Sequence, residues 1–181
     1  MKTKLNQITM IALIFALGIT GCTSPTTPAS PTANPNSAAV LAMVERMNAG
    51  DLDGSLAYFA DDAMVYFIGM PPTGMEIYRG KEQIRPIWEE CISSHFKWEV
   101  EIHSVLGDIV QVKAKTWHDF TRQLEVAPNE FFDVYLFKDG KIISYASTIT
   151  EQALAKFKPA LAKVMPPEPT PMPSLENPVS A

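Results

Sequence analysis

An aspartate within an alternating run is the first feature of this chain that could do chemistry. Asp133, Tyr135 and Phe137 alternate with other residues over 130–138, as in a β-strand with one buried face. If that face is turned to the core, the carboxyl group lies among apolar side chains, and desolvation raises its pKa. Asp133 would then be a hydrogen-bond donor or a general acid near neutral pH. The alternative is a carboxylate satisfied by neighbouring groups at the mouth of the sheet.

A histidine at the end of a second alternating run is the other candidate acid or base. Valines and an alanine alternate along residues 109–124, which we expect to form one strand, and His118 falls on their face. An imidazole near a carboxyl group can take or give a proton at physiological pH. The alternative is a partly buried histidine at a strand end. Trp117 faces the opposite side.

Other kinds of chemistry find no support in the spacing of residues. No third ligand accompanies His103 and His118 at the spacing of a metal site, so we expect no metal ion. No Gly-rich phosphate loop or nucleophile-elbow motif is present, and we expect no cofactor. The chain has 15 basic and 20 acidic residues, a formal net charge of −5. Because it also lacks a basic run, nucleic acid is not an expected partner.

The N-terminus has features in the order of a secreted lipoprotein. Lys2 and Lys4 precede a mostly apolar run over 8–19. That run is shorter than the roughly 20 residues of a spanning helix and typical of a signal peptide. Small residues directly before the lone Cys22 resemble the bacterial lipobox, which implies cleavage after residue 21 and a diacylglyceryl group on Cys22. The alternative is an ordinary secretory signal that contains a cysteine.

This resemblance implies where the protein resides. We expect a lipid-anchored protein of the bacterial cell envelope, on the outer side of the cytoplasmic membrane or in the outer membrane. Its first partner would then be the membrane. The lipid on Cys22 would hold the protein there, since buried acyl chains bind a bilayer without any spanning helix.

Composition divides the chain into four segments. We interpret 1–21 as the signal peptide, 22–37 as a Pro/Thr/Ser-rich tether, 38–158 as the folded domain and 159–181 as a Pro-rich tail. Residues 38–158 are enough for one hydrophobic core but not for two.

Helices and strands are expected in a segregated order. Apolar residues at helical spacing predict helices over 38–49, after Asp51, over 81–93 and in a last segment that ends near Pro159. Pro86 lies inside the third helix, so its first turn must be irregular or start late.

Strands are predicted from period-two alternation and turn residues. They cover 64–68, 96–106, 109–124, 130–138 and 141–149, and residues 69–79 are expected to form a loop. Asp139-Gly140 is a strong hairpin turn between the last two strands. Helices that precede an antiparallel sheet indicate an α+β fold. We expect a cone-shaped, curved antiparallel sheet wrapped around the helices.

Several motifs resemble those of the SnoaL-like and ketosteroid-isomerase-like families of the nuclear-transport-factor-2-like (cystatin-like) superfamily. They are NAGDLDG at 48–54, FADDA at 59–63, RGKEQIR at 79–85 and FDVYLFKDGKI at 132–142. The resemblance implies this fold over nearly the whole of 38–158. It says less about function, because the fold hosts isomerases, cyclases, dehydratases and binding or assembly modules.

The resemblance to ketosteroid isomerase can be followed position by position. That enzyme uses an aspartate base and an oxyanion hole made by a tyrosine and a protonated aspartate. The motifs put Met43 at the tyrosine position, Phe67 at the base and Asp133 at the protonated aspartate. Phe67 cannot move a proton, so isomerase activity by that mechanism is not expected. Trp88, Phe67, Met43 and Tyr135 form a plausible lining for a flat or apolar ligand.

Three functions remain open at this stage. The favoured one is an envelope lipoprotein that binds a small apolar ligand in its cone. The second is an enzyme of the isomerase, cyclase or dehydratase type that uses Asp133 and His118. The third is a protein-interaction or assembly module that acts through the outer sheet face near Trp117. That face is a common dimer surface in these families, so a homodimer is expected.

Overall fold

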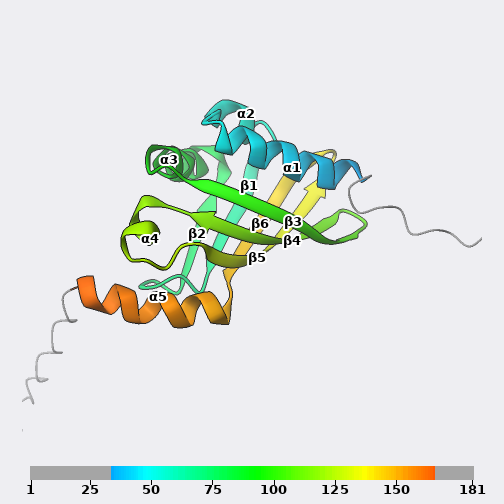
Figure 1. Cartoon of the computed structure of the whole chain (residues 1–181). Coiled ribbons are helices and arrows are strands. Elements are labelled where there is room, and N and C mark those ends of the chain that lie inside the picture. Colours follow the sequence, from blue (N-terminus) through cyan, green and yellow to red (C-terminus); the bar gives the residue numbers. More distant parts are fainter. Residues whose placement is uncertain (1–33, 166–181) are drawn as a thin grey trace, which may run out of the picture.

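The structure is a computed structural model that describes residues 34–165 (Figure 1). The predicted signal peptide, the predicted lipidation site Cys22, most of the tether and all but the first residues of the Pro-rich tail lie outside the described residues.

One curved sheet forms the body of the described chain. Its six strands lie in the order β2-β1-β6-β5-β4-β3. They are β1 (Phe59–Ile68), β2 (Met75–Arg79), β3 (Lys97–Leu106), β4 (Ile109–Trp117), β5 (Asn129–Lys138) and β6 (Lys141–Ile149). All neighbouring strands are antiparallel except β1 and β6, which run parallel. The predicted α+β class and curved sheet are confirmed, although the sheet is mixed rather than wholly antiparallel.

The parallel pair follows from the path of the chain. After β1 and β2 the chain crosses through α3 to the far edge of the sheet and returns strand by strand as β3, β4 and β5. β6 then fills the remaining place between β5 and β1, and the hairpin from β5 gives it the direction of β1. The crossover through α3 therefore joins the two edge strands β2 and β3, and the parallel strands β1 and β6 are the first and last strands in the chain.

The helices lie on the concave side of the sheet and at its mouth. They are α1 (Pro35–Asn48), α2 (Leu52–Leu56), α3 (Gly80–Ser93), α4 (Asp119–Gln123) and α5 (Glu151–Val164). Figure 1 shows α1, α2 and α3 together on one side, with α5 at the opposite end. The core joins Met43 of α1 and Trp88 of α3 to inward-facing residues of the sheet such as Val112. A smaller cluster under α5 contains Phe157 and Leu161.

Three helix boundaries differ from the sequence expectation. α1 begins at Pro35, because Asn34 accepts hydrogen bonds from the first-turn amides and proline suits the first helical position. α3 begins at Gly80, whose φ of +74° is not helical, and continues through Pro86, while α5 continues through Pro159 to Val164. Pro86 and Pro159 are both exposed, so water can satisfy the carbonyl groups that lose a partner.

Three strand boundaries also differ. β1 begins at Phe59 rather than at residue 64, with a register shift between Phe59 and Met64. The predicted loop over 69–79 is a turn followed by β2, because the Gly69 N–H donates to the Gly74 carbonyl and closes the turn early. The strand predicted over 109–124 ends at Trp117. His118 then caps α4. Its side chain accepts a hydrogen bond from the Phe120 N–H, and the Thr121 hydroxyl oxygen accepts one from the His118 N–H.

Candidate functional site

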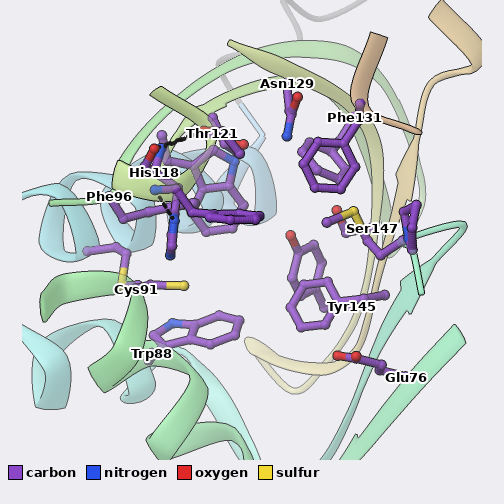
Figure 2. Close-up of a pocket in the computed structure, with 18 residues that line it drawn as sticks. Glu76, Trp88, Cys91, Phe96, His118, Thr121, Asn129, Phe131, Tyr145 and Ser147 are labelled. Carbon is purple, nitrogen blue, oxygen red and sulfur yellow. Dashed lines mark hydrogen bonds between the residues drawn. The ribbon is translucent and has the colours of Figure 1, made fainter. Parts of the chain in front are cut away.

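A cavity of about 270 Å³ opens at the mouth of the cone (Figure 2). Its wall draws residues from α1, α3, α4 and α5, from every strand and from the β1–β2 turn. Eight of the lining side chains are aromatic, among them Phe67, Trp88, Trp98, Phe131 and Tyr145. Such a wall suits an apolar, flat molecule, because aromatic faces offer a large area for contact.

Tyr145 of β6 is the centre of the aromatic cluster beneath this cavity. Its ring stacks on Tyr135 at 4.7 Å with an interplanar angle of 9°. Trp98, Phe67 and Trp88 surround it with ring centroids at 5.9, 6.2 and 6.3 Å. The tyrosine is therefore held in one position by rings on several sides, and its side chain also forms part of the cavity wall.

Asp133 lies behind Tyr145, inside the sheet. Its side chain has no exposed area, and Tyr145 Oη donates a hydrogen bond to Asp133 Oδ2 at 3.3 Å. Burial raises the pKa of Asp133 to about 7, although hydrogen bonds from Ser147 and Tyr145 favour the ionised form and oppose the shift. The prediction of a desolvated carboxyl group is confirmed. Asp133 does not line the cavity itself; Tyr145 and Ser147 stand between them.

His118 lines the cavity from the start of α4, not from a strand. Its Nδ1 accepts the Phe120 N–H at 3.1 Å, so a neutral His118 carries its proton on Nε2. Protonation of Nδ1 would break the cap. In this arrangement His118 Nε2 can donate a hydrogen bond.

Asp133 and His118 do not form a pair. Asp133 is opposite Val112 on β4, six residues from His118, which is roughly 20 Å of extended strand. Direct proton transfer between the two side chains is therefore impossible in this structure. Each could act only with other partners.

Two of the four predicted lining residues lie at the cavity wall. Phe67 and Trp88 line it, as the sequence analysis predicts. Met43 and Tyr135 have no exposed area and lie in the core behind the wall. Met43 packs under the sheet with the other apolar residues of α1, and Tyr135 is covered by Tyr145.

Several wall residues were missed in the sequence. Tyr145 and Ser147 alternate along β6 in the manner of Asp133 on β5, and this pattern could have identified them. Asn129 follows a loop and carries no comparable pattern. Phe157 lies on the apolar face of the last helix, but helical spacing does not show that this helix packs at the cavity.

Cys91 and Glu76 are two further titratable residues at the cavity wall. Burial raises the pKa of the Cys91 thiol to about 12, so it stays neutral at physiological pH. Glu76 accepts hydrogen bonds from Tyr78 Oη at 2.7 Å and Thr73 Oγ1 at 3.1 Å.

Within residues 34–165 no group of three or more metal-ligating side chains comes together. None of the helices in this range is long and apolar enough to cross a membrane.

Comparison with known proteins adds a family and a fold. The sequence profile of the SnoaL-like domain matches residues 40–145, from within α1 to β6. The fold is similar to that of an NTF2-like protein of unknown function from Burkholderia pseudomallei K96243. The two share 17% identity with a TM-score of 0.53, over 65% of this chain and 92% of that chain.

Two further solved structures have a similar fold. The epoxide hydrolase/cyclase-like enzyme SalBIII has a role in pyran ring formation in the polyether salinomycin. It is 18% identical with a TM-score of 0.53, over 68% of this chain and 97% of that chain. A computationally designed 17-OHP binder is 19% identical with a TM-score of 0.53, over 66% of this chain and 93% of that chain. At these identities the likeness establishes the fold alone.

Proposed function

The chain belongs to the SnoaL-like domain family, and from that premise we propose that it binds a small apolar ligand in the cavity of its cone. The observation that carries this proposal is the cavity of about 270 Å³ with its largely aromatic wall. Cavities of this kind bury most of a small ligand, and a few polar groups fix its orientation. The base position of the isomerase is Phe67, which favours binding over proton transfer.

Native mass spectrometry of the full-length chain, purified in detergent from its own host, tests this proposal. We expect a bound small-molecule mass that disappears in Thr116→Phe, because Thr116 of β4 lines the cavity and phenylalanine would fill it. The matched control is Thr148→Phe, the same exchange at an exposed position of β6. A ligand-free wild type, also after incubation with apolar extracts of the host, would contradict the proposal.

An enzyme is the second candidate function, and Asp133 is the observation that favours it. A buried carboxyl group with a pKa raised to about 7 can hold or release a proton near neutral pH, and Tyr145 connects it to the cavity. An isomerase, cyclase or dehydratase would use such a group. Chromatography of the bound molecule before and after incubation with protein decides between the two: a new isomer or product, absent with Asp133→Asn, identifies an enzyme.

A lipid anchor is the second part of the proposal. It rests on the order of charged n-region, apolar run, small residues and Cys22. Metabolic labelling with an alkynyl fatty acid should mark the wild type and not Cys22→Ser, and only the wild type should sediment with membranes. A soluble wild type without label would refute both the anchor and the envelope location.

A homodimer is the third part. The outer face of the sheet carries apolar side chains at Met75, Ile77 and Leu136, with exposed fractions of 55%, 52% and 37%. Covering them would remove apolar area from water. Light scattering should then give the mass of a dimer for the wild type and that of a monomer for Ile77→Glu. A monomeric wild type at micromolar concentration would contradict it.

A further inference from the structure

Glu76 of β2 brings a negative charge to the wall of the cavity. It is directly opposite Phe67 of β1, and both residues line the cavity. Its two hydrogen-bond donors, Tyr78 Oη and Thr73 Oγ1, are uncharged hydroxyl groups. None of the ion pairs formed among residues 34–165 includes Glu76. The side chain is half-buried, so its carboxylate is partly withdrawn from water without a cation beside it.

The surroundings of Glu76 add to this negative charge. Burial, the hydrogen bond to Glu76 and the charges of Glu76 and Glu90 together raise the pKa of Tyr78 to about 12. The charge of Glu90 also adds to the effect of burial on the pKa of Cys91, another residue of the wall. Neither lysine nor arginine is among the described residues that line the cavity. The wall therefore disfavours an anion and favours a positive charge.

Aromatic rings lie near Glu76 on the same side of the cavity. The ring centroids of Phe67 and Trp88 are 6.2 and 6.3 Å from that of Tyr145, and all three residues line the cavity. Figure 2 shows Glu76, Tyr145 and Trp88 together along its lower side. Aromatic faces attract cations, and cages of such rings bind ammonium groups in other proteins. The rings and the carboxylate therefore both favour a positively charged group at this side of the cavity.

The remainder of the wall limits the rest of the ligand. A bare inorganic cation would lose its hydration among mostly aromatic side chains, which is strongly unfavourable. An engineered cavity of about 150 Å³ holds one benzene ring. The 270 Å³ here suits an apolar body of two or three fused rings with a short charged arm.

We propose that the cavity binds an organic cation, an apolar ring system that carries a protonated amine, and that the ammonium group lies between Glu76 and the rings of Phe67 and Tyr145. The ligand then supplies the cation that Glu76 lacks within the described chain. This inference rests on the proposed binding function and adds the charge of the ligand and the residues that recognise it.

Equilibrium dialysis of the full-length protein with three matched probes tests the inference, with the same non-ionic detergent on both sides of the membrane. The probes are 1-naphthylmethylamine, which is protonated at pH 7, the uncharged 1-naphthylmethanol and the anion 1-naphthoate. We expect the amine to bind about tenfold more tightly than the alcohol, because a charge-assisted hydrogen bond is stronger than a neutral one. The anion should bind most weakly. Equal affinity for amine and alcohol, or preference for the anion, would overturn the inference.

Substitution of Glu76 assigns the recognition of the charge. Glu76→Gln keeps an acceptor for the Tyr78 hydroxyl and removes the charge, so the amine should bind about tenfold more weakly and the alcohol within twofold of wild type. The matched control is Glu101→Gln, the same exchange at an exposed position of β3 outside the cavity, which should change neither affinity. Retained binding of the alcohol shows that the variant is folded. Equal losses for both probes, or none, would contradict the assignment.

A nuclear magnetic resonance measurement needs no variant. The methylene protons beside the ammonium group should move upfield on binding, because ring currents shield protons that lie over aromatic faces. An unshifted methylene signal would refute the placement of the ammonium group against the rings.

The outcomes separate this inference from the binding function itself. If amine and alcohol bind equally and Thr116→Phe abolishes both, the binding function stands and only this inference falls. If no probe binds while native mass spectrometry finds a bound molecule, the result is the same. If no probe binds and the native protein is free of ligand, both fall.

Discussion

Tyr145 donates a hydrogen bond across 3.3 Å to Asp133, and it also lines the cavity that Asp133 does not reach. The phenol thus connects a buried carboxyl group to the cavity wall. Burial raises the pKa of Tyr145 well above 10, so it remains a donor throughout the physiological range. Whatever occupies the cavity will meet the Tyr145 hydroxyl and not the carboxyl group behind it.

The stability of the protein should fall with rising pH because of Asp133. Its pKa is about 7 in the folded protein and near 3.8 when unfolded, so the folded state binds more protons between these values. The contribution is complete below pH 3.8 and is lost as the pH rises through about 7, and it amounts to roughly 4 kcal/mol. Urea denaturation from pH 4 to 8 should show this loss in the wild type relative to Asp133→Asn.

A control for this pH dependence is Asp61→Asn. Asp61 is exposed, and its bond to Lys81 lowers its pKa, so its small contribution has the opposite sign. Curves of wild type and Asp133→Asn that stay parallel over pH 4 to 8 would show that the carboxyl group is not buried as described.

Tyr145→Phe should shift the pKa of Asp133 further from its ordinary value. Removal of the hydroxyl takes away one of the bonds that favour the ionised carboxyl group, so the pKa of Asp133 should rise further. The loss of the bond should cost about 1–3 kcal/mol of stability at neutral pH. Tyr66→Phe, on the same sheet in β1, is the matched control and should cost less. A carbonyl-region infrared titration of Asp133 measures the shift; an unchanged or lowered midpoint would disprove the coupling.

Alternation placed both Asp133 and His118 on the inner face, but only Asp133 lies within a strand, and this difference has a physical cause. Residues in the middle of a strand are held to period two by their neighbours on both sides, and Asp133 has a paired residue on β4 and on β6. His118 lies one residue past Trp117, the last residue of β4 that is paired with β3, and the capping box with Thr121 decides its position. A strand pattern cannot reveal where a cap interrupts it.

Wall residues of the cavity were predicted only where the pattern within a single helix or strand identified them. Trp88 and Phe67 follow from the faces of α3 and β1, but the wall also needs Phe157 from α5, which packs across the mouth from the other end of the chain. The partnerless indole of Trp98 depends on tertiary surroundings that no local pattern encodes.

Asn48 should be important for holding α1 on the sheet. Its side chain donates to the Trp98 carbonyl at 2.7 Å and accepts the Trp98 N–H at 2.8 Å, and so it satisfies both backbone groups of an edge-strand residue. Asn48→Ala should cost about 1–3 kcal/mol, because partly buried backbone groups lose their partners. Asn36→Ala, in the first turn of the same helix, should cost less. Equal denaturation midpoints for the two variants would contradict this role.

Cys91 should react slowly with thiol reagents, and a cavity ligand should slow it further. Its pKa of about 12 leaves very little thiolate at pH 8, so labelling by a disulfide reagent should be at least about a hundredfold slower than that of an exposed cysteine. The comparison is Ser93→Cys, an exposed position at the end of α3, in a Cys91→Ser background. Peptide mapping by mass spectrometry measures each site separately.

The same thiol reports on occupancy because it lines the cavity. Fluorene, a flat apolar probe, should at saturating concentration reduce labelling of Cys91 in the cavity wall and leave labelling at position 93 unchanged. Raising the pH from 8 to 10 should increase the Cys91 rate about tenfold per unit, since the thiolate fraction rises by that factor below the pKa. A Cys91 rate equal to that of the exposed cysteine, or one that levels off near pH 9, would show that the thiol is not buried at the cavity wall.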